Sequence, residues 1–178
     1  MSFLLVLILL VLLGGVILYN RLVLSRNRVL AAWSDINVQL KRRHDLIPEL
    51  VDAVRQYARY EQATLENVVA LRRASESADG VGQIGPLEAD LGRQVHRLLA
   101  LAEQYPDLKA NRSFLELQRD ITAVENDIQY ARRFYNGAVK RLNVQIGSFP
   151  DMLVARLFRF RPADYFEIED HATAAGKL

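Results

Sequence analysis

The hydrophobic pattern of the chain begins with an unbroken run. Residues 3–18 (FLLVLILLVLLGGVIL) are apolar or glycine and carry no charge. As a helix with ~1.5 Å per residue, the run is roughly 24 Å long, against a membrane hydrocarbon core of about 30 Å. Tyr19 and the residues up to Leu24 close the difference if Arg21 extends its apolar stem to the lipid headgroups. The run leaves no polar face, so it does not suit a buried core helix.

This run predicts an uncleaved transmembrane anchor over residues 1–20. The alternative is a cleaved signal peptide, which requires basic residues before the run and a cleavage site with small residues after it. Met1 and Ser2 are not basic, and residues 18–21 (LYNR) make a poor cleavage site. Basic residues follow the run but do not precede it. The positive-inside rule therefore predicts a single-pass protein with its N-terminus outside and its C-terminal part in the cytoplasm.

Helical spacing of apolar residues continues after the anchor and predicts an all-α fold. We expect the membrane helix to continue into an antiparallel four-helix bundle over residues 21–147. The expected helices are at about 19–44, 46–74, 87–104 and 114–146. The first boundary rests on Asp45 as an N-cap and Pro48 in a first turn. The alternative is one helix kinked at Pro48, because the apolar spacing runs through this junction.

Three further features refine the expected bundle. Residues 75–86 are rich in glycine and predict a flexible loop. Lys41, Arg42 and Arg43 occupy the expected last turn of the first helix, where cations complement the helix dipole, and the alternative is a phosphate-binding or partner-binding patch. The strict apolar spacing over 114–142 indicates the buried stripe of a bundle helix, with a coiled-coil oligomer contact as the alternative.

Residues 148–167 form a C-terminal segment that predicts a short amphipathic helix. Basic and large apolar side chains alternate in it, so it either caps the open end of the bundle or lies in a membrane interface. The cap is the preferred interpretation. The membrane interface is the alternative, because the fourth helix of such a bundle ends where the first helix leaves the membrane. We predict a disordered tail over residues 168–178. The candidate membrane-interface residues are Tyr19, Arg21, Arg156, Phe158, Arg159, Phe160 and Arg161.

Composition gives no indication of an enzyme. The chain has no cysteine, which excludes disulfides and thiol chemistry, and its net charge of +2 is too small to indicate a nucleic-acid partner. His44, His96 and His171 have no metal-ligand spacing, and no glycine-rich phosphate loop precedes a helix. We therefore predict no catalytic, cofactor-binding or metal-binding residue and no small-molecule substrate.

Several motifs resemble those of the LemA family of bacterial membrane proteins. The resemblance covers nearly all of the chain from residue 19, and it departs from the family pattern at His44, where the family has tyrosine. It implies an N-terminal helix in the bacterial inner membrane and a cytoplasmic four-helix bundle, without an established activity. Some family members are encoded near membrane metalloproteases or other envelope proteins, which makes such a protein a candidate partner. The motifs are residues 19–23 (YNRLV), 32–51 (AWSDINVQLKRRHDLIPELV), 105–111 (YPDLKAN), 135–136 (YN), 148–150 (SFP) and 161–167 (RPADYFE).

Two functions are consistent with these patterns. The first is a non-enzymatic membrane-anchored scaffold that forms a homo-oligomer or docks an envelope protein. The second is a lipid-facing module in which residues 152–161 bind or organise the membrane leaflet. Candidate partner contacts are positions that a bundle core does not require, although they could instead cap helices and close the bundle ends. They are Asp45, Pro48, Phe149, Pro150, Phe158, Tyr165 and Phe166.

Overall fold

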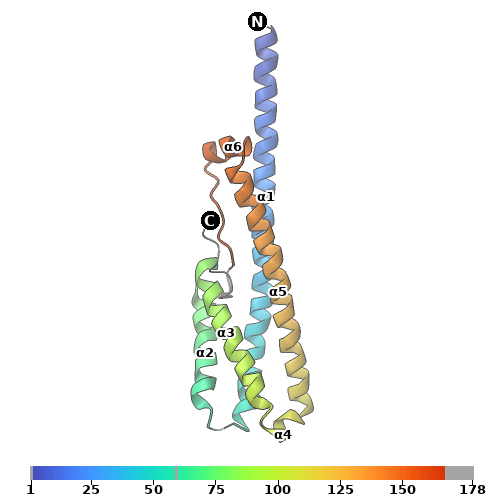
Figure 1. The fold of residues 1–178 in the computed structure, drawn as a ribbon, viewed down its shortest axis with the longest axis vertical. Coiled ribbons are helices and arrows are strands. Elements are labelled where there is room, and N and C mark those ends of the chain that lie inside the picture. Colours follow the sequence, from blue (N-terminus) through green and yellow to red (C-terminus); the bar gives the residue numbers. More distant parts are fainter. Residues whose placement is uncertain (1, 59, 167–178) are drawn as a thin grey trace, which may run out of the picture. The chain divides into compact units, whose positions relative to one another are not determined.

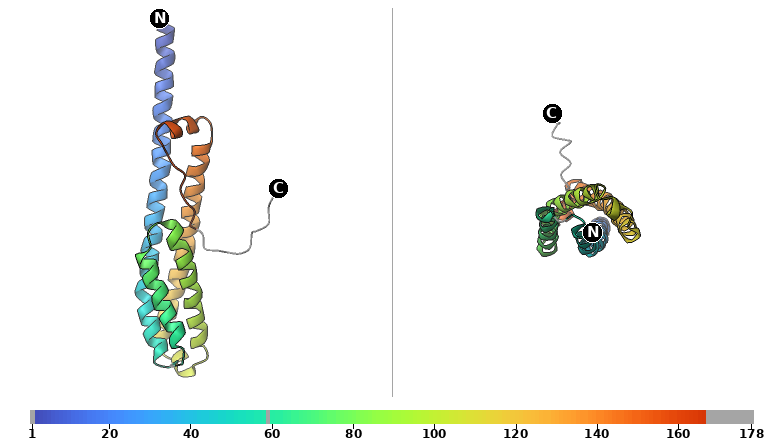
Figure 2. Two further views of the ribbon diagram at one scale, coloured as in Figure 1. Left: turned by 90° about the vertical axis from the view of Figure 1, so that its left-hand side faces the viewer. Right: turned by 90° about the horizontal axis from the view of Figure 1, so that it is seen from below.

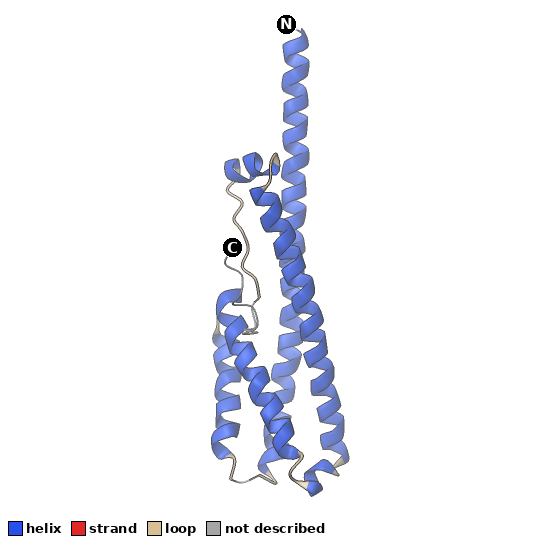
Figure 3. Ribbon diagram, viewed as in Figure 1, coloured by secondary structure: helices blue, strands red, loops and turns tan. Residues whose placement is uncertain are grey.

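The computed structural model describes residues 2–58 and 60–166. Every regular element in this part of the chain is a helix, which confirms the predicted all-α fold (Figure 3). The predicted tail over 168–178 lies outside the described residues. The helices are α1 (Ser2–Arg55), α2 (Gln62–Ser77), α3 (Val81–Ala102), α4 (Pro106–Lys109), α5 (Arg112–Gly147) and α6 (Asp151–Leu157).

The chain divides into two compact units. The first unit contains α1 up to Ile36 together with Ala131–Tyr165, which includes the second half of α5 and all of α6. The second unit contains Asn37–Tyr130 and Phe166. The helices α2, α3 and α4 lie wholly in the second unit, so the four-helix packing is confined to a narrower range than the predicted 21–147.

The apolar run belongs to α1 in the first unit. This helix is long and apolar enough to span a membrane, and none of the residues in its most apolar stretch is buried within the chain. Exposed apolar side chains on every face are what contact with lipid requires. We therefore describe α1 as a candidate membrane-spanning helix near the N-terminus.

After the run, α1 buries one face in the first unit. Its buried residues are spaced by three, four or seven positions and thus lie on one side of the helix. The second half of α5 supplies the opposing residues, and the rings of Trp33 and Tyr135 pack with centroids 5.6 Å apart. In both side views α6 lies beside α1 (Figures 1 and 2). The buried apolar residues are Leu22, Val29, Ala32 and Ile36 of α1, Tyr135, Val139 and Leu142 of α5, and Ala155 of α6.

The second unit is a four-helix bundle with its own core. It is built from the last part of α1, from α2 and α3, and from the first part of α5, with α4 between α3 and α5. Full burial of each large aliphatic side chain stabilises the fold by about 1.5–3 kcal/mol. The core contains Ile47, Leu50, Val51, Val54, Ala58, Leu65, Val68, Leu91, Val95, Leu98, Ala102, Leu108, Phe114, Leu117 and Ile121.

The predicted boundary between helices 19–44 and 46–74 is wrong. One helix, α1, passes through Pro48 and ends at Arg55, and the next begins at Gln62. Pro48 has no N–H to donate to the carbonyl of His44, four residues earlier. Arg72 of α2 donates from Nε to this carbonyl oxygen at 2.8 Å. Because this acceptor is satisfied, the helix continues past the proline.

The predicted flexible loop over 75–86 is also wrong in extent. The connection between α2 and α3 is short, because α2 ends at Ser77 and α3 begins at Val81. Gly80 precedes α3 with a φ of 81°, a left-handed conformation that glycine adopts without a steric penalty. Pro86 lies inside α3 and is exposed. The backbone carbonyl that Pro86 leaves without an amide partner belongs to Gly82, which is also exposed and can be solvated.

The remaining helices agree with the expected ones apart from their ends. The third covers Val81–Ala102 rather than 87–104, and the fourth covers Arg112–Gly147 rather than 114–146. Asn111 accounts for the earlier start of α5, because its side-chain oxygen accepts hydrogen bonds from the amides of Ser113 at 2.9 Å and Phe114 at 3.2 Å. Asn111 is therefore the residue that caps this helix.

Candidate functional site

Three aromatic residues of the first unit form a cluster at the end of the apolar run. The ring of Tyr19 in α1 lies 4.7 Å from that of Phe158 and 5.9 Å from that of Phe160, measured between centroids. Both phenylalanines follow α6, far from Tyr19 in the sequence. The structure thus brings together three of the predicted membrane-interface residues, and we call them the aromatic cluster.

A cavity of about 610 Å³ adjoins the aromatic cluster, and we call it the arginine cavity. Arginines from α1 and from the segment after α6 line it, and none of its lining residues is acidic. Asn27 adds an amide, so hydrogen-bond donors lie beside an aromatic wall. The complete lining is Tyr19, Val23, Arg26, Asn27, Leu30, Leu142, Phe158, Arg159, Phe160 and Arg161.

A tight turn at the end of α6 positions the aromatic cluster. Arg159 has a φ of 56°, in the left-handed region. Its amide bonds to the carbonyl of Arg156 at 3.3 Å, and the amide of Phe160 bonds to the carbonyl of Ala155 at 2.9 Å. This pair of bonds closes a helix C-terminus in the Schellman pattern, in which glycine is the usual left-handed residue. The chain reverses at this turn, so that Phe158 and Phe160 both contact Tyr19.

Two side chains of α5 hold the segment that follows this turn. Asn143 donates from Nδ2 to the carbonyl of Ala163 and accepts from its amide, both at 2.9 Å. The hydroxyl of Tyr135 donates to the carbonyl of Asp164 at 2.8 Å. Burial raises the pKa of Tyr135 above its ordinary value, and the charge of Asp164 acts in the same direction. The hydroxyl therefore remains protonated and available as a donor at neutral pH.

The other predicted interface residues are separate from the cavity. Arg21 and Arg156 are exposed but do not line it. The sequence pattern did not indicate Arg26 and Asn27, which lie two turns beyond Tyr19 on the same side of α1. Asn143 was not indicated either, although its place next to Leu142 in the apolar stripe puts this polar side chain at the edge of the buried face. Arg26, Asn27 and Asn143 belong to the site only because the segment after α6 folds back along α1 and α5, and this return is not visible in the sequence.

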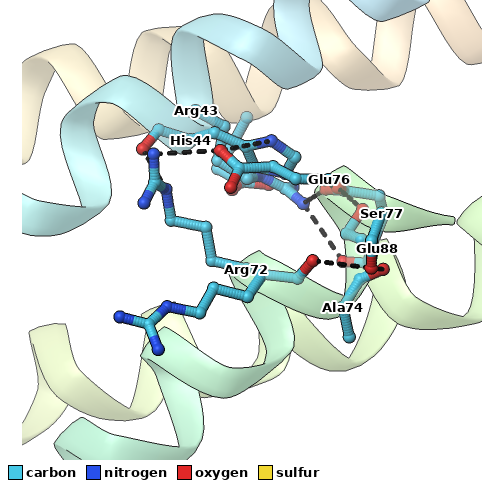
Figure 4. Close-up of polar contacts among 10 residues, drawn as sticks. Arg43, His44, Arg72, Ala74, Glu76, Ser77 and Glu88 are labelled. Carbon is cyan, nitrogen blue, oxygen red and sulfur yellow. Dashed lines mark hydrogen bonds and ion pairs between the residues drawn. The ribbon is translucent and has the colours of Figure 1, made fainter.

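A second group of polar residues is buried in the second unit and centres on Glu88 of α3 (Figure 4). Glu88 is 1% exposed and accepts from Arg43 Nη1 at 2.7 Å. His44 Nε2 lies 2.6 Å from its other oxygen, which also accepts from the hydroxyl of Ser75. Arg43 also reaches Glu125 of α5, with Nη2 2.5 Å from the carboxylate. We call these five residues the buried ion cluster.

The buried ion cluster corrects the interpretation of the basic run at residues 41–43. Lys41 and Arg42 are exposed, and Arg42 pairs with Asp127 at 3.3 Å. Arg43, however, is only 3% exposed and lies inside α1 rather than in its last turn. Its positive charge is matched by the buried carboxylate of Glu88 and the partly buried carboxylate of Glu125, instead of by a helix terminus or by solvent.

Glu88 remains charged despite its burial. Burial raises the pKa of this carboxyl, but the hydrogen bond with His44, the charge of Arg43 and the hydrogen bond from Ser75 together outweigh that effect. The pKa of Glu88 is consequently lower than that of an ordinary glutamate. In the part of the chain that the structure describes, no group of three or more His, Asp or Glu side chains could hold a metal ion.

The predicted partner contacts differ in their exposure. Asp45 and Pro48 are exposed in the second unit, and Phe149, Pro150, Phe158 and Tyr165 are exposed in the first. Phe149 is 77% exposed. Phe166 is fully buried, so its prediction as a surface contact is wrong. Its aromatic side chain is removed from water by packing instead. His96 is exposed, and His171 lies outside the described residues.

Comparison with known proteins yields bacterial relatives. Protein LemA of Metamycoplasma hominis is 29% identical, over 77% of this chain and 63% of the relative. Magnetosome protein MamQ 2 of Paramagnetospirillum magneticum is 25% identical, over 84% of this chain and 64% of the relative. Magnetosome protein MamQ of Magnetospirillum gryphiswaldense is 24% identical, over 83% of this chain and 64% of the relative. The chain therefore spans a little under two thirds of the length of the curated relatives it matches.

The family match covers most of the chain. Residues 32–177 match the LemA family. This range includes α2 to α6, the buried ion cluster and the turn at Arg159, and it agrees with the motifs that resemble the family. The chain belongs to the LemA family.

Proposed function

We propose that this chain is a non-enzymatic scaffold, anchored by one transmembrane helix in the bacterial inner membrane, that self-associates or docks an envelope protein. The N-terminus lies outside and the bundle in the cytoplasm, according to the positive-inside rule. The observation that carries the proposal is the continuity of α1, which runs from Ser2 to Arg55 without interruption. One helix thus presents an exposed apolar surface to lipid and then contributes to a bundle core.

Exposed apolar side chains outside the membrane run support docking. Phe134 of α5 is 65% exposed, and Leu30 of α1 and Phe149 are also exposed in the same unit. Each of these exposed apolar side chains is a candidate position for contact with a partner. A second copy of the chain, a membrane metalloprotease or another envelope protein is the partner that we propose.

The buried ion cluster supports a structural rather than a catalytic role. Its central carboxylate is occupied by three side chains, one of them the strongly basic Arg43. A catalytic acid or base needs access to a reacting group and a pKa near the working pH. Glu88 has neither, because it is buried and its pKa is lowered.

The mass of the full-length protein in mild detergent tests the scaffold proposal. We expect light scattering with micelle correction to give a discrete oligomer, or crosslinking in native membranes to capture one defined partner. Phe134→Ser should reduce the association, whereas Lys140→Ser, an exposed change on the same helix, should not. A monomer without a crosslinked partner would contradict the proposal.

A second candidate function is contact between residues 152–161 and the membrane leaflet. The observation that favours it is the aromatic cluster, which holds this segment against Tyr19, where α1 leaves the apolar run. Aromatic side chains prefer the membrane interface, and arginines interact with anionic lipids. Both kinds of residue occur in this segment.

Trypsin provides a test of leaflet contact, because Arg156 and Arg159 are exposed. We expect cleavage after these residues to be slower in nanodiscs containing acidic lipid than in nanodiscs of neutral lipid. Cleavage after Arg73, exposed on α2 in the other unit, is the internal reference. Equal protection in both lipids, or none in either, would contradict electrostatic contact with the leaflet.

A further inference from the structure

We infer that the arginine cavity binds the phosphate group of an acidic phospholipid headgroup. The inference rests on the second candidate function, leaflet contact, and it specifies one lipid-binding site within that contact. A phosphate diester carries one negative charge and oxygen acceptors, which match guanidinium and amide donors. The lining of the cavity combines these donors with aromatic and aliphatic side chains that suit the glycerol and upper acyl region of a lipid.

The charge around the cavity supports an anionic ligand. Arg26, Arg159 and Arg161 line it, and none of them pairs with a carboxylate within residues 2–58 and 60–166. Other arginines of the chain, such as Arg43 and Arg72, do pair with glutamates. Three arginines around one cavity repel each other, and a bound anion would relieve this repulsion.

The backbone at Arg159 provides a second, independent observation. Its left-handed conformation closes α6 in a pattern in which glycine is usual. Glycine would form the same two backbone hydrogen bonds with less strain, but it would remove a guanidinium from the cavity. Strained backbone positions often coincide with ligand-binding residues. The strain at Arg159 is therefore consistent with a binding role for its side chain.

The position of the cavity along α1 selects a lipid over a soluble phosphate. Residues 3–18 form the apolar run, roughly 24 Å long at 1.5 Å per residue, and Tyr19 follows it at the membrane interface. Arg26 lies roughly 10 Å further along the same helix, on the headgroup side of Tyr19. A volume of about 610 Å³ lies within the range of small-ligand sites.

Native mass spectrometry of the full-length protein, released from detergent with added lipid, measures binding at this site. The probes are phosphatidylglycerol, which is acidic, and phosphatidylcholine, which is neutral overall. We expect phosphatidylglycerol to bind about tenfold more tightly, the equivalent of one charge-assisted hydrogen bond. Arg159→Gln and Arg26→Gln should each remove most of this preference.

Arg28→Gln is the matched control. It removes the same charge from α1, two residues after Arg26, but Arg28 is exposed and does not line the cavity. We expect it to change phosphatidylglycerol affinity by less than about twofold. Arg159→Gly separates binding from folding, because it should lose the lipid preference while its midpoint of thermal unfolding stays the same or rises.

Several results of these binding measurements would overturn the headgroup site. Equal loss of affinity in Arg28→Gln and Arg159→Gln would overturn it, since binding would then depend only on net charge. An unchanged affinity in Arg159→Gln and Arg26→Gln would also overturn it. Competition by millimolar inorganic phosphate or glycerol 3-phosphate would assign the site to a soluble phosphate instead of a lipid. If the trypsin protection persists while the headgroup preference is missing, leaflet contact stands and the headgroup site alone fails.

Discussion

Arg72 donates a hydrogen bond from Nε to the carbonyl oxygen of His44 at 2.8 Å. His44 lies four residues before Pro48. In a regular helix its carbonyl would accept a hydrogen bond from the backbone amide of residue 48, but proline has no N–H to donate. A side chain from α2 thus takes the place of the missing backbone amide in α1. The contact accounts for the continuation of α1 to Arg55 and links two helices of the bundle at that point.

We predict that Arg72→Met destabilises the protein by about 1–3 kcal/mol, because it leaves a carbonyl without a donor. In a Pro48→Ala background the amide of residue 48 can bond to His44, so the same substitution should cost less. A double-mutant cycle by chemical denaturation should give a coupling of about 1 kcal/mol. The pairing of Arg72 with Glu76 is present in both backgrounds and cancels. Additive effects would contradict this explanation of how α1 passes the proline.

The buried ion cluster predicts a large effect of removing one charge. Glu88→Leu should lower the free energy of unfolding by about 3–5 kcal/mol, because it leaves Arg43 buried with less compensating charge. The double variant Arg43→Met, Glu88→Leu should recover a substantial part of this loss. Asp90→Leu, a change at a half-exposed residue on the same helix, is the control and should have little effect, because it removes only a surface ion pair with Arg93. If the double variant is less stable than Glu88→Leu, the charges are not compensating one another.

The lowered pKa of Glu88 predicts a loss of stability in acid. Near and below pH 4.5 the unfolded chain takes up a proton at this carboxyl more readily than the folded chain does. Its stabilising contribution is therefore present above pH 4.5 and is lost as the pH falls through the lower pKa of the folded state. Glu88→Gln should weaken this dependence in denaturation curves recorded from neutral pH downwards. Identical dependence in both proteins would contradict the assignment.

The bonds of Asn143 predict that it holds the segment after α6. Asn143→Ala should increase the amide hydrogen exchange of residues 160–165 by about thirtyfold, since it removes two hydrogen bonds of about 1 kcal/mol each. Val144→Ala, a substitution at the exposed next residue, should leave that exchange unchanged. Unaltered exchange in Asn143→Ala would show that other contacts hold the segment.

Sequence alone predicts the features of this fold that depend on local patterns. The apolar run of α1 and the regular spacing of α5 follow from residues that are close in the chain. The boundary at Pro48 does not, because its outcome depends on Arg72, which is remote in the sequence. The burial of Arg43 and His44 could not be predicted for the same reason. Both belong to a basic run in the sequence, but in the fold they contact Glu88, which is remote in the sequence and buried.

The candidate site follows the same rule. The aromatic and basic character of residues 156–161 is visible in the sequence, and so is the interfacial position of Tyr19. The contribution of Arg26 becomes apparent only when the turn at Arg159 returns the chain to α1. Periodicity does not reveal this turn, because arginine is not the residue expected in a left-handed conformation.

The central claim is that residues 152–161 lie at the headgroup layer beside Tyr19. The chain has no cysteine, so a spin label can be placed at single cysteines in nanodiscs of the full-length protein. Leu157→Cys tests the claim, since Leu157 is 76% exposed at the end of α6. Leu10→Cys, within the apolar run, and Arg73→Cys, exposed on α2, are the references for membrane and water.

Collision of these labels with oxygen and with a water-soluble nickel complex measures their depth. We predict that the label at residue 157 lies at an intermediate depth, close to the lipid phosphates, while residue 10 is in the hydrocarbon core and residue 73 in water. If the label at residue 157 is as accessible to the nickel complex as the label at residue 73, the segment lies away from the membrane. That result would contradict the account.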